Sequence, residues 1–251
     1  MPATDSINRV AAFKVAFITC ASVFLMGYIN AFTFNAPDLG LMATPQSGNI
    51  IWLGINAASG SWRSFADNLG LFFGFIAGTV FAVFTQNIFK NKKIQFFFNW
   101  TTFVLPVILY PLVMQYVAPP YVSYFVLGFA CGAALGFFRK LYHLEINNAM
   151  ATANVRLLGL NFAGAYLKKN KKEVAAFRLY LLCVFLYAAG AFFYTKFAQM
   201  DSGLGLDGRG HAIGLGGHYI DGAPSNIVRV AGLIVFCAIP YFFCPKSAAA
   251  E

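Results

Sequence analysis

Residues 12–34 read AFKVAFITCASVFLMGYINAFTF, an apolar block that contains a single charged side chain, Lys14. A helix that spans a bilayer needs about 20 mainly apolar residues. The block is continuous and does not alternate in polarity, and backbone groups in lipid must be satisfied within the segment, so we expect a helix. Because the block is too long for the apolar part of a typical signal peptide, it is interpreted as the first membrane span.

Five further blocks of the same kind follow along the chain. They cover residues 69–89, 96–117, 121–138, 174–197 and 226–244. Only 11% of the residues are charged, against about 25% in soluble domains, and the mean hydropathy is +0.65. The sequence therefore predicts an all-α, polytopic membrane helix bundle with six spans, formed by residues 1–251 as a single membrane domain in a lipid bilayer.

The basic residues gather in alternate loops and set the predicted orientation. Lys90, Lys92 and Lys93 follow the second block, and a further basic cluster occupies the loop at residues 139–172. Positive loops stay in the cytoplasm, so both termini are predicted to be cytoplasmic. This distribution also explains the net charge of +9 without a nucleic-acid partner. The glycine-rich loop at residues 201–222 lies outside in this topology, and its sequence indicates no role.

Two apolar stretches are too short and too polar to count among the six spans. They are residues 44–59, TPQSGNIIWLGINAAS, and residues 147–166, NNAMATANVRLLGLNFAGAY. Thr44-Pro45 is typical of a helix start. Counting both stretches as spans would move the lysines after the second block outside, against the charge rule. We therefore predict two broken or re-entrant helices inside the bundle, with helices lying along the membrane surface as the alternative.

The two short stretches also resemble each other. SGNIIWLGIN starts at residue 47 and TANVRLLGLN starts at residue 152, an offset of 105. The same offset places Gly27 over Gly132, whereas Gly78 matches Gly190 at an offset of 112. Each half, about residues 12–117 and 121–245, holds three spans, so the halves must run in opposite directions. The sequence predicts an inverted 3+3 repeat.

In secondary transporters built from inverted repeats, interrupted segments at matching places form the binding site near the midplane. Polar side chains within a bundle usually face its interior or a cavity. The candidate substrate-binding residues are Asn30, Ser47, Asn49, Thr152, Asn154 and Arg156. The alternatives are hydrogen bonds between helices that only hold the bundle together and, for Arg156, a side chain that extends to the lipid headgroups.

Two motifs resemble a known family. GYINAF at residues 27–32 and SGN at residue 47 are similar to the G-Y-x-D-A and T-G-N motifs of the YoaK-like bacterial inner-membrane proteins. The resemblance extends over about residues 12–198 and implies six spans and a bacterial inner-membrane location, but no substrate. Asn30 stands where that family carries aspartate, which removes a titratable group.

The chain is predicted to be a secondary-type transporter or permease of a small, unidentified substrate. The alternative is a non-transporting scaffold or accessory subunit. No HExxH, GxSxG or P-loop motif occurs in the sequence, so we expect no enzyme, cofactor or metal site. Gly74-x-x-x-Gly78 indicates close helix packing within the bundle, with a homodimer face as the alternative. Trp100 and the other tryptophans are predicted to lie at the membrane surfaces.

Overall fold

The computed structural model describes residues 3–34, 43–44, 46–110, 119–141, 144–147, 151–168, 171–202 and 227–242. Within these residues the chain is almost entirely helical, and a two-stranded antiparallel hairpin pairs Lys140 with Glu145. The elements are α1 (Ala3–Phe34), α2 (Gln46–Ala58), α3 (Trp62–Ile88), α4 (Lys92–Leu109), α6 (Pro120–Phe137), β1 (Lys140–Leu141), β2 (Leu144–Glu145), α7 (Ala151–Lys168), α8 (Lys171–Ser202) and α9 (Ile227–Phe242). The predicted all-α membrane bundle is confirmed.

Each of the six predicted spans corresponds to a helix in the described part of the chain. Four stretches are long and apolar enough to cross a membrane: Phe13–Thr33, Trp62–Ile88, Pro120–Phe137 and Lys171–Phe197. The other two, α4 and α9, are shorter apolar helices that also carry an internal proline, Pro106 and Pro240. The count of six spans therefore stays a prediction, because four stretches in the described part of the chain meet the length and composition of a span.

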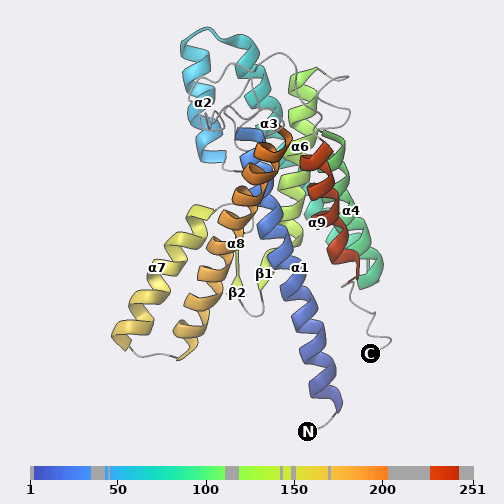
Figure 1. The fold of residues 1–251 in the computed structure, drawn as a ribbon, viewed down its shortest axis with the longest axis vertical. Coiled ribbons are helices and arrows are strands. Elements are labelled where there is room, and N and C mark those ends of the chain that lie inside the picture. The colour runs from blue at the N-terminus through green and yellow to red at the C-terminus, as the bar shows by residue number, and fades with distance from the viewer. Residues whose placement is uncertain are drawn as a thin grey trace.

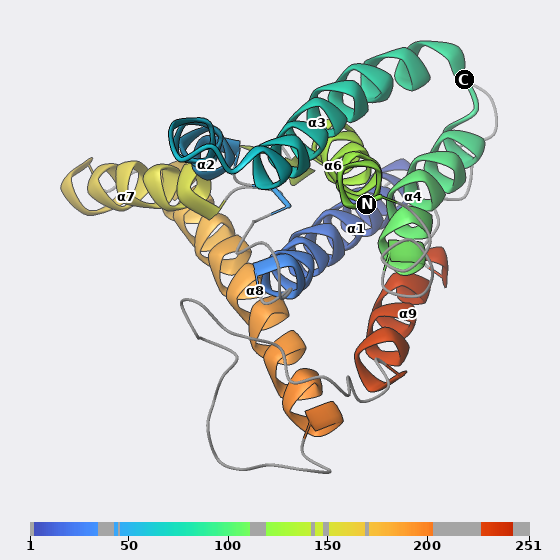
Figure 2. The same cartoon turned by 90° about the horizontal axis from the view of Figure 1, so that it is seen from above.

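Two pairs of helices in van der Waals contact form the centre of the bundle, α1 with α8 and α3 with α6 (Figures 1 and 2). Glycines allow this approach. Gly27 of α1 lies against the carbonyl oxygen of Tyr187, and Gly190 of α8 lies against that of Phe24. A Cβ atom at either glycine would overlap the neighbouring backbone, so only glycine fits at these two positions.

The α3–α6 seam repeats this arrangement with different residues. Gly78 of α3 lies against the carbonyl oxygen of Phe129, and Gly132 of α6 lies against that of Phe75. Gly74 contacts α6 as well, so the predicted Gly74-x-x-x-Gly78 motif packs inside the bundle. The alternative reading of this motif as a homodimer face is wrong, because α6 already covers it.

The two short helices form hairpins with the helices that follow them, α2 with α3 and α7 with α8. In both views their first turns lie close together near mid-height of the bundle, and from there α2 runs upward and α7 downward (Figures 1 and 2). Helices α4 and α9 close the remaining side, α4 against α6 and α9 against α8 and α1. The start of α1 and the end of α9 lie on the same side (Figure 1).

Aromatic side chains fill the contact between α4 and α9. Trp100 is fully buried there, and its indole N–H donates to the carbonyl oxygen of Cys237 at 2.9 Å. Phe103 and Phe138 pack edge-on against the same indole. The predicted surface position of Trp100 is wrong, because this buried indole finds its hydrogen-bond partner in a neighbouring helix and not in the headgroups.

We expect Gly132→Ala to lower the stability of the folded protein by about 1–3 kcal/mol, because the added methyl group would overlap the backbone of Phe75. Gly159→Ala is the matched control, since nothing lies within 4 Å of a Cβ at that position. There alanine should be neutral or stabilising by up to about 1 kcal/mol. Thermal unfolding of the purified protein in detergent measures both, and equal midpoints would contradict the close contact.

Candidate functional site

A buried hydrogen-bonded cluster joins α1, the chain before α2, and α8. The Asn30 side-chain amide donates to the Thr44 hydroxyl and to the Tyr187 hydroxyl, and its oxygen accepts from the Thr44 backbone N–H at 3.1 Å. Both N–H donors of Asn30 are therefore engaged within the protein. In this arrangement Asn30 holds the chain just before α2, and its predicted role in substrate binding stays a prediction.

A second bond of the same kind lies one helical turn further along α1. The Thr33 hydroxyl accepts from the backbone N–H of Ala43 at 3.1 Å. Together, Asn30 and Thr33 hold the backbone of residues 43–44 against α1, in a region where both residues are at most a few per cent exposed. Backbone groups without a local helix partner must be satisfied in some other way when buried, and α1 supplies that partner here.

The start of α7 is held by a different asparagine. The Asn154 amide donates to the carbonyl oxygen of Asn147 at 2.7 Å, and its oxygen accepts from the N–H of the same residue at 3.0 Å. The Tyr180 hydroxyl of α8 donates to the nearby carbonyl oxygen of Glu145 at 3.0 Å. The chain before α7 is thereby tied both to α7 itself and to α8.

Helix α2 is polar on its buried side and apolar on its exposed side. Gln46, Asn49 and Asn56 are buried, and Asn49 is only 1% exposed. Ile51 and Ile55 lie on the exposed side. A helix in water would show the reverse pattern. This inside-out distribution is expected of a helix that has protein on one side and lipid on the other.

Helix α7 follows the same rule. Asn154 is buried, whereas Leu160, Phe162 and Tyr166 are exposed. Asn154 and Asn161 occupy the positions that Asn49 and Asn56 hold in α2, at the offset of 105 residues. Asn49 and Asn154 are thus buried at matching positions, whereas Asn161 is half-buried and donates to the Leu157 carbonyl of its own helix. The matching buried carboxamides favour re-entrant helices over helices in the membrane surface.

The six predicted site residues fall into two groups. Asn30, Asn49 and Asn154 are buried, and each makes hydrogen bonds within the protein. The other three have exposed side chains on the first turns of α2 and α7: Ser47, Thr152 and Arg156. A role of these residues in substrate binding stays a prediction.

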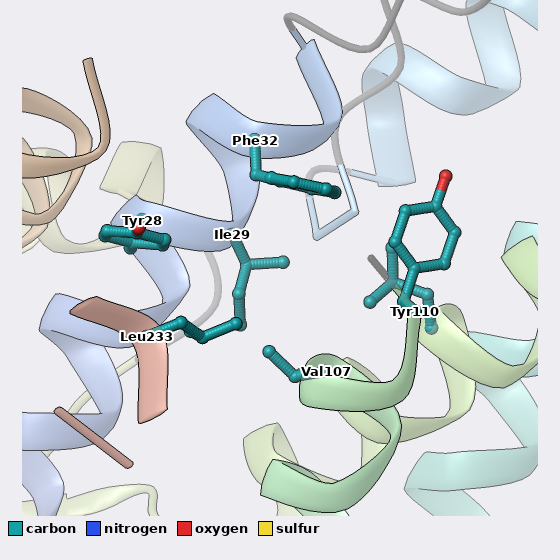
Figure 3. Close-up of a pocket in the computed structure, with 7 residues that line it drawn as sticks. Tyr28, Ile29, Phe32, Val107, Tyr110 and Leu233 are labelled. Atoms are coloured by element: carbon teal, nitrogen blue, oxygen red, sulfur yellow. The ribbon is translucent and has the colours of Figure 1, made fainter. Parts of the chain in front are cut away.

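A small cavity lies deeper in the bundle, away from the first turns of α2 and α7. Figure 3 shows Ile29 and Phe32 of α1 facing Val107 of α4 and Tyr110 directly after it. Tyr28 of α1 and Leu233 of α9 lie on the other side of Ile29. Its volume of about 10 Å³ is at the limit for one water molecule, and its lining is almost entirely apolar. In this conformation the cavity cannot hold a solute larger than water.

Several polar groups of the cluster were missed from the sequence. Tyr187 gives no signal because it reads as one aromatic residue in an apolar span. Gln46 lies within the quoted stretch, and its side-chain N–H₂ group is buried without a hydrogen-bond partner among the described residues. No set of three or more histidine, cysteine, aspartate or glutamate side chains in the described part of the chain is arranged to hold a metal ion.

Asn30→Leu is expected to destabilise the protein by about 1–3 kcal/mol, because it leaves the Thr44 N–H and two hydroxyl groups without their partner. Asn30→Asp should cost less, since a carboxylate accepts from all three and both hydroxyl groups can rotate to donate. The thermal midpoints of the two variants in detergent give the order. A larger loss for the aspartate variant would contradict the assigned bonding.

The sequence was compared with known families and proteins. It matches the family described as "Protein of unknown function (DUF1275)" over residues 18–203, which is more than half of the chain. No curated protein and no solved structure matches it. The YoaK-like proteins fall within this family, so the resemblance in the motifs at residues 27–32 and 47–49 is confirmed at the level of the family. The chain belongs to the DUF1275 family of membrane-type helical proteins of unknown function.

Proposed function

We propose that this protein is a secondary-type transporter or permease of a small substrate, built as an inverted 3+3 repeat and located in a bacterial inner membrane. The single observation that carries the proposal is the pair of inside-out helices α2 and α7. They are short, they start close together at mid-height, and they turn carboxamides inward at matching positions (Figures 1 and 2). Transporters with inverted repeats place such helices around the substrate.

The glycine contacts support the repeat. Gly27 lies against Tyr187. Adding 105 to the first number and subtracting 112 from the second gives the contact of Gly132 with Phe75. In the same way, the contact of Gly190 with Phe24 becomes that of Gly78 with Phe129. The two offsets come from the sequence alone, yet they also relate backbone contacts in space. This agreement supports a true repeat over a chance resemblance between two apolar segments.

The helix directions are consistent with inversion. In Figure 1, α1 runs upward and α6 downward, α3 downward and α8 upward, and α4 upward and α9 downward. Each helix of the first half therefore opposes its counterpart in the second half. Helices of the two halves also exchange partners, since α1 packs on α8 and α3 packs on α6. An axis in the membrane plane relates such halves.

The orientation with cytoplasmic termini is also part of the proposal. The turn between α3 and α4, the end of α6 and the turn between α7 and α8 lie on the same side as the start of α1 (Figure 1). These turns carry most of the loop lysines and arginines, including Lys90, Arg139 and Lys171. One basic side fits the charge rule for inner-membrane proteins.

The two tightly packed pairs suggest how substrate would pass. Backbone contact at the glycines makes α1–α8 and α3–α6 rigid units, whereas side chains such as Tyr28 and Leu127 meet between the units around the small cavity. We propose that the units rock against each other across this apolar contact, which exposes the first turns of α2 and α7 to one side at a time. In the conformation described, the side chains of Figure 3 leave no passage for a solute between the units.

The alternative function is a membrane scaffold or accessory subunit that transports nothing. The observation in its favour is the small size and apolar lining of the cavity between α1, α4, α6 and α9. The two functions differ in what the buried carboxamides do. In a scaffold they only join helices, so their loss should reduce the amount of folded protein and leave no solute-specific effect.

Transport is tested by comparing the uptake of metabolites by cells with and without the protein, measured by mass spectrometry of the medium. We expect Asn49→Ala to abolish the uptake of the solute so identified while membrane abundance stays near that of the wild type. Ser59→Ala is the control, because this exposed serine lies at the far end of α2. Identical uptake profiles with and without the protein would exclude transport and favour the scaffold.

Orientation is tested separately with single cysteines. A cysteine at Lys172, at the start of α8, should be protected from an impermeant maleimide in intact cells, and one at Ser61, in the turn between α2 and α3, should react. The native Cys131, Cys183 and Cys237 are buried and give little background. Reaction at position 172 in intact cells would reverse the proposed topology.

A further inference from the structure

The first turn of α2 combines two sources of hydrogen-bond donors for which the described part of the chain supplies no acceptor. One is the Gln46 side chain, which is only 8% exposed. Its oxygen accepts from the Asn49 amide at 3.4 Å, so its N–H₂ group points away from Asn49. That N–H₂ group has no hydrogen-bond partner in the described part of the chain. A buried donor left without an acceptor is unfavourable, and an incoming acceptor would remove that cost.

The other source is the helix backbone. Helix α2 runs from Gln46 to Ala58 and has no acidic residue in its first turn. The N–H groups of such a turn have no partner within the helix, and they carry the positive end of the helix dipole, equivalent to about half an elementary charge. Asn30 and Thr33 hold the preceding residues 43–44 in place, so this helix end is fixed before any ligand arrives.

Space is available beside the same turn. A Cβ atom built on the half-buried Gly48 meets no atom within 4 Å. Cβ atoms in a helix lean toward its N-terminal end, so this open space lies on the side of the free N–H groups. Glycine is a poorer helix former than alanine, and no contact among the described residues requires it at this position. The open space leaves room for a ligand to approach the backbone.

The charge of the site limits what it can bind. Helix α2 contains no lysine, arginine, aspartate or glutamate. Helix α2 itself therefore offers donors and a partial positive charge, and it contributes no full cation of its own. This suits a group with acceptor oxygens and a single negative charge, which is a carboxylate, and it is poorly matched to a phosphate dianion, for which an arginine or lysine is usual.

We propose that the first turn of α2 binds the carboxylate of a small monoanion, with the Gln46 amide and the free backbone N–H groups as donors. The inference deepens the proposed transport function by assigning the class of substrate. Only the first half of the repeat carries this site. The repeat places Ala151 at the position of Gln46 and Ala153 at that of Gly48, so the first turn of α7 lacks both the free amide and the glycine.

The test uses the full-length protein purified in detergent, with sodium propionate as the probe and sodium chloride keeping the ionic strength constant. Propionate should raise the thermal midpoint in a saturable way, and the neutral propionamide should not. Gln46→Ala and Gln46→Glu should each weaken propionate binding about tenfold or more, the second because its carboxylate repels the ligand. Circular dichroism and gel filtration check that the variants fold.

Two glycine variants provide a matched comparison. Gly48→Ala should weaken propionate binding although its Cβ meets no protein atom, whereas Gly54→Ala, later in the same helix and equally open, should bind as the wild type does. Unchanged binding in Gln46→Glu, an equal loss in both glycine variants, or no response of the wild-type protein to propionate would each overturn the inference.

Uptake of radiolabelled propionate into proteoliposomes separates this inference from the proposed function. Binding without uptake would leave the carboxylate site in place and contradict transport. Uptake of another solute, identified from the metabolite comparison, by a protein that does not bind propionate would support transport and refute the carboxylate site.

Discussion

The approach of backbone to backbone at glycines is the constraint on which the rest of the structure depends. Gly27 and Gly190 join α1 to α8, and Gly78 and Gly132 join α3 to α6. In lipid there is no hydrophobic drive between helices, so close packing of this kind supplies much of the association free energy. The hairpin partners α2 and α7 and the covering helices α4 and α9 pack around these pairs.

The architecture could be predicted from the sequence because its signals are local. Apolar blocks identify helices, lysines in alternate loops give direction, and the matched motifs at residues 47 and 152 relate the halves. The partners of the helices could not be predicted, because a glycine in an apolar run shows that something comes close but not what. Trp100 shows the same limit, since its burial depends on the carbonyl oxygen of Cys237, far away in the chain.

The candidate site was predicted in part. The sequence indicated Asn30, Asn49 and Asn154 as buried polar residues, and the structure buries all three. It could not show that Asn30 and Asn154 are engaged with the backbone of neighbouring segments, nor that the amide of Gln46 is left free. A side-chain amide forms such a hydrogen bond only if the backbone before the helix passes within bonding distance of it. The pattern of residues does not determine that distance.

The hydrogen bond from Asn30 to Tyr187 also has a consequence for how the chain is made. The two residues are 157 positions apart, so α1 is synthesised long before its partner α8 exists. At about 5–20 residues per second, the ribosome needs roughly 8–30 s to reach Tyr187. During that interval the amide of Asn30 and the bare surface at Gly27 are without their final partner in the membrane. This face of α1 therefore acquires its final packing only when the last third of the protein arrives.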